Sequence, residues 1–435
     1  MNTSPQLQSA LSRYVDRHRD RLLEILQELV RIPSENTPPT GGEQKCQAWI
    51  AKLLAEIGWK PELYDIDEVP GLLAHPLFHP GRNYRGRPNL AAQRKGSGGG
   101  RSLLLTGHID TVPRGTLAWT RDPFSGYIEG TRLYGRGSND MKGGIATNLF
   151  VAECVAKLNL PLRGDLLFES VIDEEFGGAN GTLAGRLRGH NADAVILSEP
   201  SSLRICPAQR GGQIAHVIFR SVSGGVLQHD HFPTGAIPQL THFLSCVQDF
   251  AAQRTLHARP HEMYAFLKDP VPVVVTKVFT GPWGFGEPIT VPDLAQVEMY
   301  WQFMPGETGA EVEREFRQWL RDVVAQAPHV FPVSPEVRYP IRCLPGSAIS
   351  ATDPLVTELL ACAEKTLGAK PAIEGIEGPC DMFIFQQGFQ IPAVIFGACG
   401  SNTHAPDEYV EIESLVSAAK TLLLFVAEWC GSDPS

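Results

Sequence analysis

Short apolar runs that end abruptly in polar or glycine residues restrict most strongly how this chain can fold. Three of them cover residues 103–107, 166–172 and 194–198, and a fourth covers residues 393–397. Apolar runs of this length are typical of strands that helices cover on both faces. The sequence therefore predicts an α/β protein whose main sheet is mostly parallel.

Each of these runs leads toward a residue that can bind a metal ion. These residues are, in the order of the runs, His108, Glu175, Glu199 and His404, and a fifth, Asp140, follows a glycine-rich turn. Ligand sites of open α/β sheets gather beyond the carboxyl ends of the strands, so we expect the five side chains to converge. One such side chain alone indicates only a polar strand end, but five together predict a two-metal hydrolase site.

Length and charge exclude several classes of protein. A chain of 435 residues is too long for one compact core, which favours two domains. The 38 Lys and Arg residues against 48 Asp and Glu residues give a net charge of −10. An acidic balance argues against a nucleic-acid partner and against an anionic membrane surface. We therefore expect a small-molecule substrate.

The chain shows no sign of export or of a membrane span. Leu22, Ile25, Leu26 and Leu29 recur at helical spacing, as in an amphipathic surface helix rather than a leader. No stretch approaches the roughly 20 apolar residues that cross a bilayer. Nine cysteines without a CxxC pair favour reduced thiols, and hence the cytoplasm. A thiol hydrolase is a remote alternative.

The pattern of the chain changes after Cys206. Strands are expected at 213–223, 273–278 and 294–303, with helices at 240–252 and 310–324, which describes a separate α+β module. From residue 353 the chain returns to the alternating helices and strands seen before Cys206, with a helix from residue 353 and another over 414–429. The sequence predicts a first part of the catalytic domain at 1–209, a smaller inserted domain at 210–346, and the second part at 347–435. Residues 65–89 are expected to form a long loop, which is often functional.

Five strings carry a resemblance to a known family. They are GHIDTVP at 107–113, GRGSNDMKGG at 135–144, DEEFGG at 173–178, SEP at 198–200 and THAPDE at 403–408. In this order and spacing they resemble the co-catalytic zinc family of aminoacylases, acetylornithine deacetylase, succinyl-diaminopimelate desuccinylase and glutamate carboxypeptidase. The resemblance covers nearly the whole catalytic part.

The resemblance implies a role for each matching residue. Two zinc ions, or cobalt or manganese in their place, would share Asp140 as a bridging ligand. His108 and Glu199 would complete one metal site, and Glu175 and His404 the other. Glu174 would be the general base on a metal-bridging water, and Asp110 would orient His108 through its second ring nitrogen. The family also places a cis peptide after the bridging aspartate, here Asp140–Met141.

The same resemblance makes the inserted domain a lid that forms a homodimer. A lid histidine of the family reaches the neighbouring subunit's site and stabilises the tetrahedral oxyanion. His229 matches it, although the loop is one residue short and His231 competes for the role. A solvent-exposed turn histidine is the alternative.

The lid also departs from the family at its substrate clamp. Ile289 and Gln302 stand where amino-acid-specific members have the Asn and Arg that hold a substrate carboxylate. A neutral Gln cannot make the bidentate charged contact of Arg. The substrate is therefore expected to lack a carboxylate there, unless another cation such as Arg210 binds it.

The expected activity is hydrolysis of the amide bond of an N-acyl amino acid or related N-acyl amine. A dipeptidase or carboxypeptidase of the same family is the alternative among hydrolases. A non-catalytic metal-binding relative is the alternative of another class.

Overall fold

A computed structural model describes residues 4–227 and 235–431 of the chain. Two compact units make up the structure. The first unit comprises Met1–Ala208, Ala348–Ile376 and Cys380–Ser435, and the second comprises Gln209–Ser347 and Glu377–Pro379. The boundaries between the units at 208/209 and 347/348 thus lie one residue away from the boundaries predicted at 209/210 and 346/347. The short return of Glu377–Pro379 to the second unit was not anticipated.

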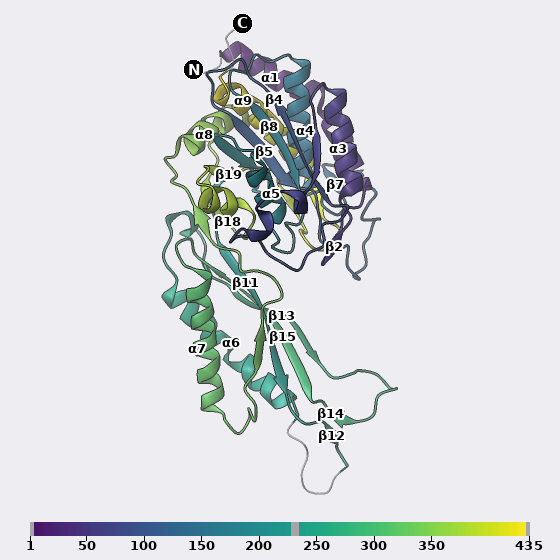
Figure 1. Cartoon of the computed structure of the whole chain (residues 1–435), viewed down its shortest axis with the longest axis vertical. Helices are drawn as coiled ribbons and strands as arrows, with labels where there is room; N and C mark the ends of the chain where they lie inside the picture. Colours follow the sequence, from purple (N-terminus) through teal and green to yellow (C-terminus); the bar gives the residue numbers. More distant parts are fainter. Residues whose placement is uncertain (1–3, 228–234, 432–435) are drawn as a thin grey trace. The chain divides into compact units, whose positions relative to one another are not determined.

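A nine-stranded sheet forms the centre of the first unit (Figure 1). The strand order is β17-β10-β19-β9-β5-β8-β4-β3, and β18 pairs with β10. The strands are β3 (Glu62–Asp65), β4 (Pro88–Arg94), β5 (Leu103–His108), β8 (Leu166–Val171), β9 (Ala194–Leu197), β10 (Ile205–Gln209), β17 (Ser347–Ala348), β18 (Ile373–Ile376) and β19 (Ala393–Ile395).

The four central strands of this sheet are parallel, and the strands directly beside them, β4 and β10, run against them. Parallel pairs join β5 to β8, β5 to β9, and β9 to β19, whereas β4 pairs antiparallel with β8 and β10 with β19. Loops rather than crossover helices connect β3, β4 and β5, which allows successive strands to reverse direction. The predicted α/β class is confirmed, and the sheet as a whole is mixed.

Helices flank the central sheet and explain its apolar composition. Every residue of β5, β8 and β9 is buried, so each of these strands is largely apolar. Helix α4 packs on β5 and β8, and α5 packs on β8. The helices of this unit are α1 (Pro5–Arg17), α2 (Arg19–Arg31), α3 (Gln44–Glu56), α4 (Lys142–Lys157), α5 (Asn180–Arg188), α8 (Pro354–Leu367) and α9 (Ile412–Trp429).

A small second sheet brings two distant segments of the first unit together. It has the order β20-β21-β7-β6, with β6 (Tyr127–Glu129), β7 (Arg132–Tyr134), β20 (Gly400–Ser401) and β21 (Tyr409–Glu411). Tyr134 pairs with Tyr409, so the turn after β7 and the loop before β21 lie side by side. The first unit also contains a two-stranded antiparallel ribbon, in which β1 (Asn36–Thr37) pairs with β2 (Thr40–Gly41).

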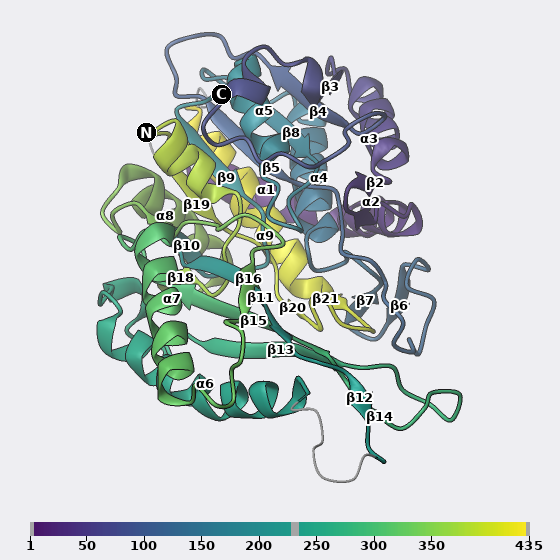
Figure 2. The same ribbon diagram turned by 60° about the horizontal axis from the view of Figure 1, so that its bottom comes forward.

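The second unit is a four-stranded antiparallel sheet packed on two helices (Figure 2). The strand order is β13-β15-β11-β16, and β12 pairs with β14 outside it. The elements are β11 (Gly211–Arg220), β12 (Gly224–Gly225), α6 (Ile237–His257), β13 (Val273–Thr280), β14 (Thr290–Val291), β15 (Leu294–Phe303), α7 (Gly309–Gln326) and β16 (Glu336–Arg338). Aromatic residues, among them Phe250, Trp301 and Phe316, fill the core between sheet and helices. Strand β13 lies at an edge of the sheet.

Within the described ranges, no helix has both the length and the apolar character that a membrane crossing requires.

Candidate metal centre

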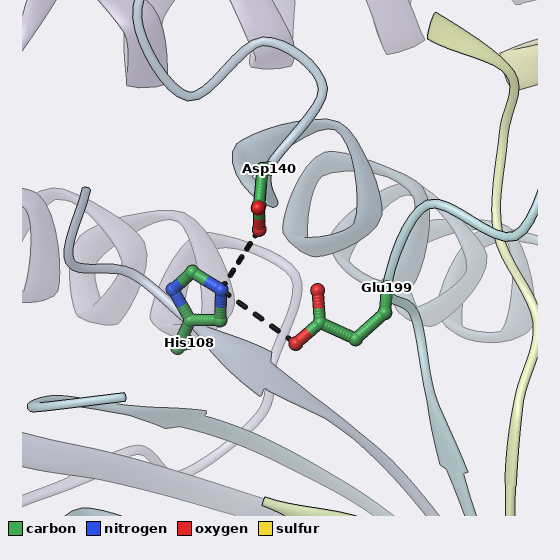
Figure 3. A group of neighbouring side chains, drawn as sticks. All are labelled: His108, Asp140 and Glu199. Carbon is green, nitrogen blue, oxygen red and sulfur yellow. Dashed lines mark hydrogen bonds and ion pairs between the residues drawn. The ribbon is translucent and has the colours of Figure 1, made fainter. Parts of the chain in front are cut away.

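The ends of two neighbouring parallel strands bring His108 and Glu199 together. His108 is the last residue of β5, and Glu199 follows β9 by two residues. His108 Nε2 lies 3.6 Å from Glu199 Oε1 and 3.1 Å from Asp140 Oδ1. Figure 3 shows the two carboxylates facing this ring nitrogen. These three side chains form a group whose ligand atoms lie within 4.8 Å of one another.

A second group shares Asp140 with the first. His404 Nε2 lies 2.8 Å from Glu175 Oε2 and 3.3 Å from Asp140 Oδ2. Asp140 therefore directs one carboxylate oxygen to each group. The structure thus brings together all five residues that the sequence predicted as metal ligands.

The glycine-rich turn after β7 holds Asp140 between these groups. The Asp140–Met141 peptide is cis, as the family resemblance predicted. Helix α4 begins directly after this turn and approaches the end of β9 very closely. A Cβ atom at Gly144 would lie 2.0 Å from the main-chain oxygen of Ser198, so only glycine fits there.

The carboxylate of Glu408 fixes this turn from the neighbouring loop. It accepts hydrogen bonds from Arg136 Nη1 at 2.6 Å and from the main-chain N–H groups of Gly137, Asn139 and Asp140 at 3.0 Å each. Glu408 follows His404 by four residues. One buried carboxylate thus connects the segments that carry Asp140 and His404.

Asp110 contacts the second ring nitrogen of His108 through its main chain. His108 Nδ1 lies 2.8 Å from the main-chain oxygen of Asp110, and 3.7 Å from its carboxylate. The carboxylate instead accepts hydrogen bonds from the main-chain N–H groups of Glu174 and Glu175 at 3.1–3.2 Å. Nδ1–H donation to a carbonyl leaves the Nε2 lone pair facing the carboxylates.

Charges within the two groups shift their protonation strongly. Burial alone would lower the pKa of His108 and His404, but the surrounding carboxylates raise both, that of His404 to about 11. Burial raises the pKa of Glu175 and Glu199, and the nearby Asp140 carboxylate adds to this rise. Burial would also raise the pKa of Asp140, but hydrogen bonds from the two imidazoles hold it below its ordinary value. The carboxylates therefore require positive charge among them.

Glu174 lies beside the two groups without belonging to either. Its Oε2 atom is 3.9 Å from His108 Nε2. Burial raises the pKa of Glu174 well above its ordinary value, although the His108 imidazole opposes this rise. A carboxylate with a raised pKa next to a cation site has the properties of a general base.

One carboxylate near the site was missed by the sequence analysis. Asp381 is buried, accepts a hydrogen bond from Thr182 Oγ1 at 2.5 Å, and adds to the rise in the pKa of Glu174 and Glu199. A Gly-Pro turn after a short strand precedes it, and this was the available signal. The lid candidates His229 and His231 lie outside the described residues.

Comparisons with known proteins identify relatives along the whole chain. A family model described as "Peptidase family M20/M25/M40" matches residues 104–428. N-formyl-4-amino-5-aminomethyl-2-methylpyrimidine deformylase of Bacillus subtilis (strain 168) is 26% identical, over 97% of each chain. Succinyl-diaminopimelate desuccinylase of Methylobacterium sp. (strain 4-46) is 28% identical, over 90% of this chain and 92% of its own.

Solved structures show the same fold. The di-peptidase Dug1p of Saccharomyces cerevisiae superposes with a TM-score of 0.75 at 15% identity, over 98% of this chain and 99% of its own. A dinuclear metal binding peptidase of Bacillus subtilis, YXEP, superposes with a TM-score of 0.60 at 18% identity, over 96% of this chain and all of its own.

Proposed function

This chain belongs to peptidase family M20/M25/M40, whose members are metal-dependent hydrolases of amide bonds, and we propose that it is a dinuclear-metal N-acyl amine hydrolase with Glu174 as general base. The sharing of Asp140 between two groups of potential ligands carries this proposal. Two cation sites with a common carboxylate beside a free glutamate are the arrangement that assisted amide hydrolysis needs.

The residues present fit a pair of divalent cations. Imidazole nitrogen and carboxylate oxygen are donors that suit zinc, cobalt and manganese. The two imidazoles are drawn toward protonation because the carboxylates around them lack another counter-charge, and bound cations would replace these protons. Such a pair would supply the Lewis acidity that polarises an amide carbonyl.

Glu174 would move the proton during the reaction. Its carboxylate takes a proton from the attacking water and delivers it to the leaving amine nitrogen as the C–N bond breaks. Asp110 supports this role because its carboxylate holds the main-chain N–H groups of Glu174 and Glu175. The products are a carboxylic acid and a free amine.

The contacts of Gln302 and Arg210 favour a substrate without a carboxylate at the lid clamp. Gln302 is 5% exposed, and its Nε2 donates to Tyr300 Oη at 2.6 Å and to Glu377 O at 2.7 Å. Arg210 is equally buried and donates to the main-chain oxygens of Glu377 and Pro270 at 2.6–3.0 Å. The donor groups of both side chains are thus already hydrogen-bonded within the second unit, and neither presents a pair of N–H groups to a substrate carboxylate.

The named substrate of one relative agrees with this reading. The N-formylated aminomethylpyrimidine in the name of the Bacillus subtilis deformylase contains no carboxyl group. We therefore infer that the substrate here is an N-acyl amine, such as an N-formyl or N-acetyl arylmethylamine, rather than an N-acyl amino acid.

A homodimer formed through the second unit is part of the proposal. Edge strand β13 exposes Val274, Val278 and Phe279, the last at 56%. An uncovered apolar edge strand is a template for pairing with another copy. In the cytoplasm, the nine cysteines would remain reduced, which agrees with the free thiols of the described chain.

Hydrolysis of a substrate panel tests the proposed activity. Protein loaded with zinc, cobalt or manganese would be assayed with N-formyl and N-acetyl arylmethylamines, N-acetyl and N-succinyl amino acids, and dipeptides. We expect the N-acyl amines to be the best substrates. Chelation should abolish turnover, and Glu174→Gln should lower kcat by roughly 10²- to 10⁴-fold.

The control variant is Glu129→Gln, which changes an exposed glutamate paired with Arg121. It should retain full activity. Chelator-resistant turnover would exclude the two-metal mechanism. Preference for dipeptides would identify a peptidase instead, and silence across the panel with two metals bound per chain would favour a binding protein.

A further inference from the structure

The residue before the general base has an unusual backbone conformation. Asp173 follows β8 and has φ of 64°, in the left-handed region, although it is not glycine. It is fully buried. Aspartate tolerates this region better than most residues, but surrounding structure must maintain such a conformation at a buried site. The contacts of Asp173 therefore determine where Glu174 points.

Residues of the long loop between β3 and β4 supply most of these contacts. Tyr84 Oη donates to Asp173 Oδ2 at 2.6 Å, and Arg82 Nε lies 3.2 Å from Asp173 Oδ1. Asn36 Nδ2 also donates to Oδ1, at 3.3 Å. This is the loop that the sequence analysis singled out by its length.

Tyr84 joins the two ends of the turn that carries Glu174. Its hydroxyl donates to Asp173 and accepts a hydrogen bond from Asn180 Nδ2 at 2.6 Å. Asn180 in turn exchanges hydrogen bonds with the main chain of His79, and Arg82 Nη2 donates to Phe176 O at 2.9 Å. The loop thus forms hydrogen bonds with the start, the middle and the end of the 173–180 turn.

The turn packs closely against the carboxylate of Asp173. A Cβ atom at Gly178 would lie 2.0 Å from Asp173 Oδ2. Asn36 Nδ2 donates to the carboxylate of Asp110 at 2.9 Å and to that of Asp173 at 3.3 Å, so it connects the two. Asp110 then holds the N–H groups of Glu174 and Glu175. These hydrogen bonds therefore fix the main chain of Glu174 in two places. One is the preceding residue, Asp173, and the other is the main-chain N–H of Glu174 itself.

We propose that Tyr84 and Asp173 are positioning residues for Glu174, the phenol hydroxyl locking the Asp173 carboxylate and thereby the turn that presents the general base. This role rests on the proposed function of Glu174. Neither residue supplies a ligand to the two candidate metal groups, so their effect on catalysis is separable from metal binding.

Replacement of Tyr84 by Phe tests the proposal with one atom removed. Amide hydrogen exchange over residues 171–180 should accelerate, because the two ends of the turn lose their common partner. In the metal-loaded protein, kcat should fall by roughly 10- to 100-fold, with KM within about twofold of the native value and two metals still bound. Asp173→Asn, which keeps the shape of the side chain but not its charge, should reproduce the fall in kcat.

Tyr64→Phe is the matched control. It removes another buried phenol oxygen, which accepts a hydrogen bond from Asn89 at 3.1 Å. Exchange over 173–180 and kcat should both stay native in this variant.

Unchanged exchange in Tyr84→Phe, or equal acceleration in Tyr64→Phe, would overturn the proposal without reference to any substrate. Faster exchange with native kcat, in an enzyme that Glu174→Gln inactivates, would also overturn it. Full activity of Glu174→Gln would refute the proposed function itself, and the exchange result would then stand as a purely structural finding.

Discussion

The carboxylate of Glu408 organises the site without approaching a substrate. Its four hydrogen-bond donors come from a single turn, residues 136–140, and its own loop carries His404. A carboxylate can accept from all four donors at once, whereas an amide presents N–H groups to some of them. Glu408 therefore determines how accurately Asp140 and His404 meet.

Glu408→Gln should weaken metal binding and stability together. We expect metal affinity to fall by roughly 10- to 100-fold, and the free energy of unfolding to fall by about 1–3 kcal/mol because Arg136 loses its carboxylate. Metal titration followed by calorimetry and denaturant unfolding would measure both. The control is Glu411→Gln, which changes the ion pair between Glu411 of β21 and Arg132 of β7. It should leave metal affinity unchanged. Equal behaviour of the two variants would contradict the role of Glu408.

The sequence indicated which side chains the structure brings together, because each of them follows a local signal. His108 ends a buried strand, Glu175 and Glu199 lie within four residues of the ends of two others, and Asp140 follows a turn rich in glycine. Glu408 and Tyr84 had no such signal, because their importance arises from partners 272 and 89 residues away in the chain.

At the scale of elements, helix α5 ends next to a titratable group that affects stability. Gly189, at φ of 94°, terminates the helix, and the main-chain N–H of His190 then donates to Gly185 O at 3.0 Å. Burial lowers the pKa of His190 below its ordinary value of about 6.5. The folded protein therefore binds fewer protons at His190 than the unfolded chain does just below pH 6.5.

This difference predicts a loss of stability in mild acid. The contribution of His190 is complete above about pH 6.5 and declines as the pH falls toward the lower pKa of the folded state. Urea unfolding at pH 7.5 and 5.5 should show that His190→Gln loses less stability between the two values than the native protein does. The same loss in both proteins would show that His190 does not contribute.

The strand arrangement was predictable only where local pattern determines it. The buried central strands β5, β8 and β9 read as apolar runs, and their parallel pairing follows from the helices between them. The antiparallel strands β4 and β10 contain proline and polar residues among their apolar ones, and nothing in a single strand specifies the direction of its neighbour. In the second unit, β15 was predicted at its observed bounds, Leu294–Phe303, because apolar and polar residues alternate along it.

At the scale of the whole molecule, the oligomeric state depends on strand β13. Val278→Lys places a charge on this edge, where lysine opposes strand pairing. We expect the native protein to be a dimer in light scattering after gel filtration, and the variant to be a monomer. Val333→Lys, at another exposed valine of the second unit, should remain dimeric. A dimeric Val278→Lys variant would place the interface elsewhere.

Metal binding should stabilise the fold as a whole. A ligand that binds only the folded state adds about 2.7 kcal/mol when its free concentration is 100 times Kd. Zinc or cobalt should therefore raise Tm of the chelator-treated native protein. Asp140→Asn, which alters the carboxylate common to both ligand groups, should show little or no rise. An equal rise in the variant would exclude Asp140 as a shared ligand.

The three residues Glu377–Pro379 have a consequence for how the gene can be dissected. The chain passes four times between the units, so the second unit is not one uninterrupted stretch. Residues 209–347 expressed alone would lack the carbonyl of Glu377, which receives hydrogen bonds from both Arg210 and Gln302. A buried guanidinium would then lose two of its three hydrogen bonds. Recombination that exchanged this unit between relatives at its two obvious borders would therefore transfer an incomplete module, and Glu377–Pro379 has to be exchanged with it.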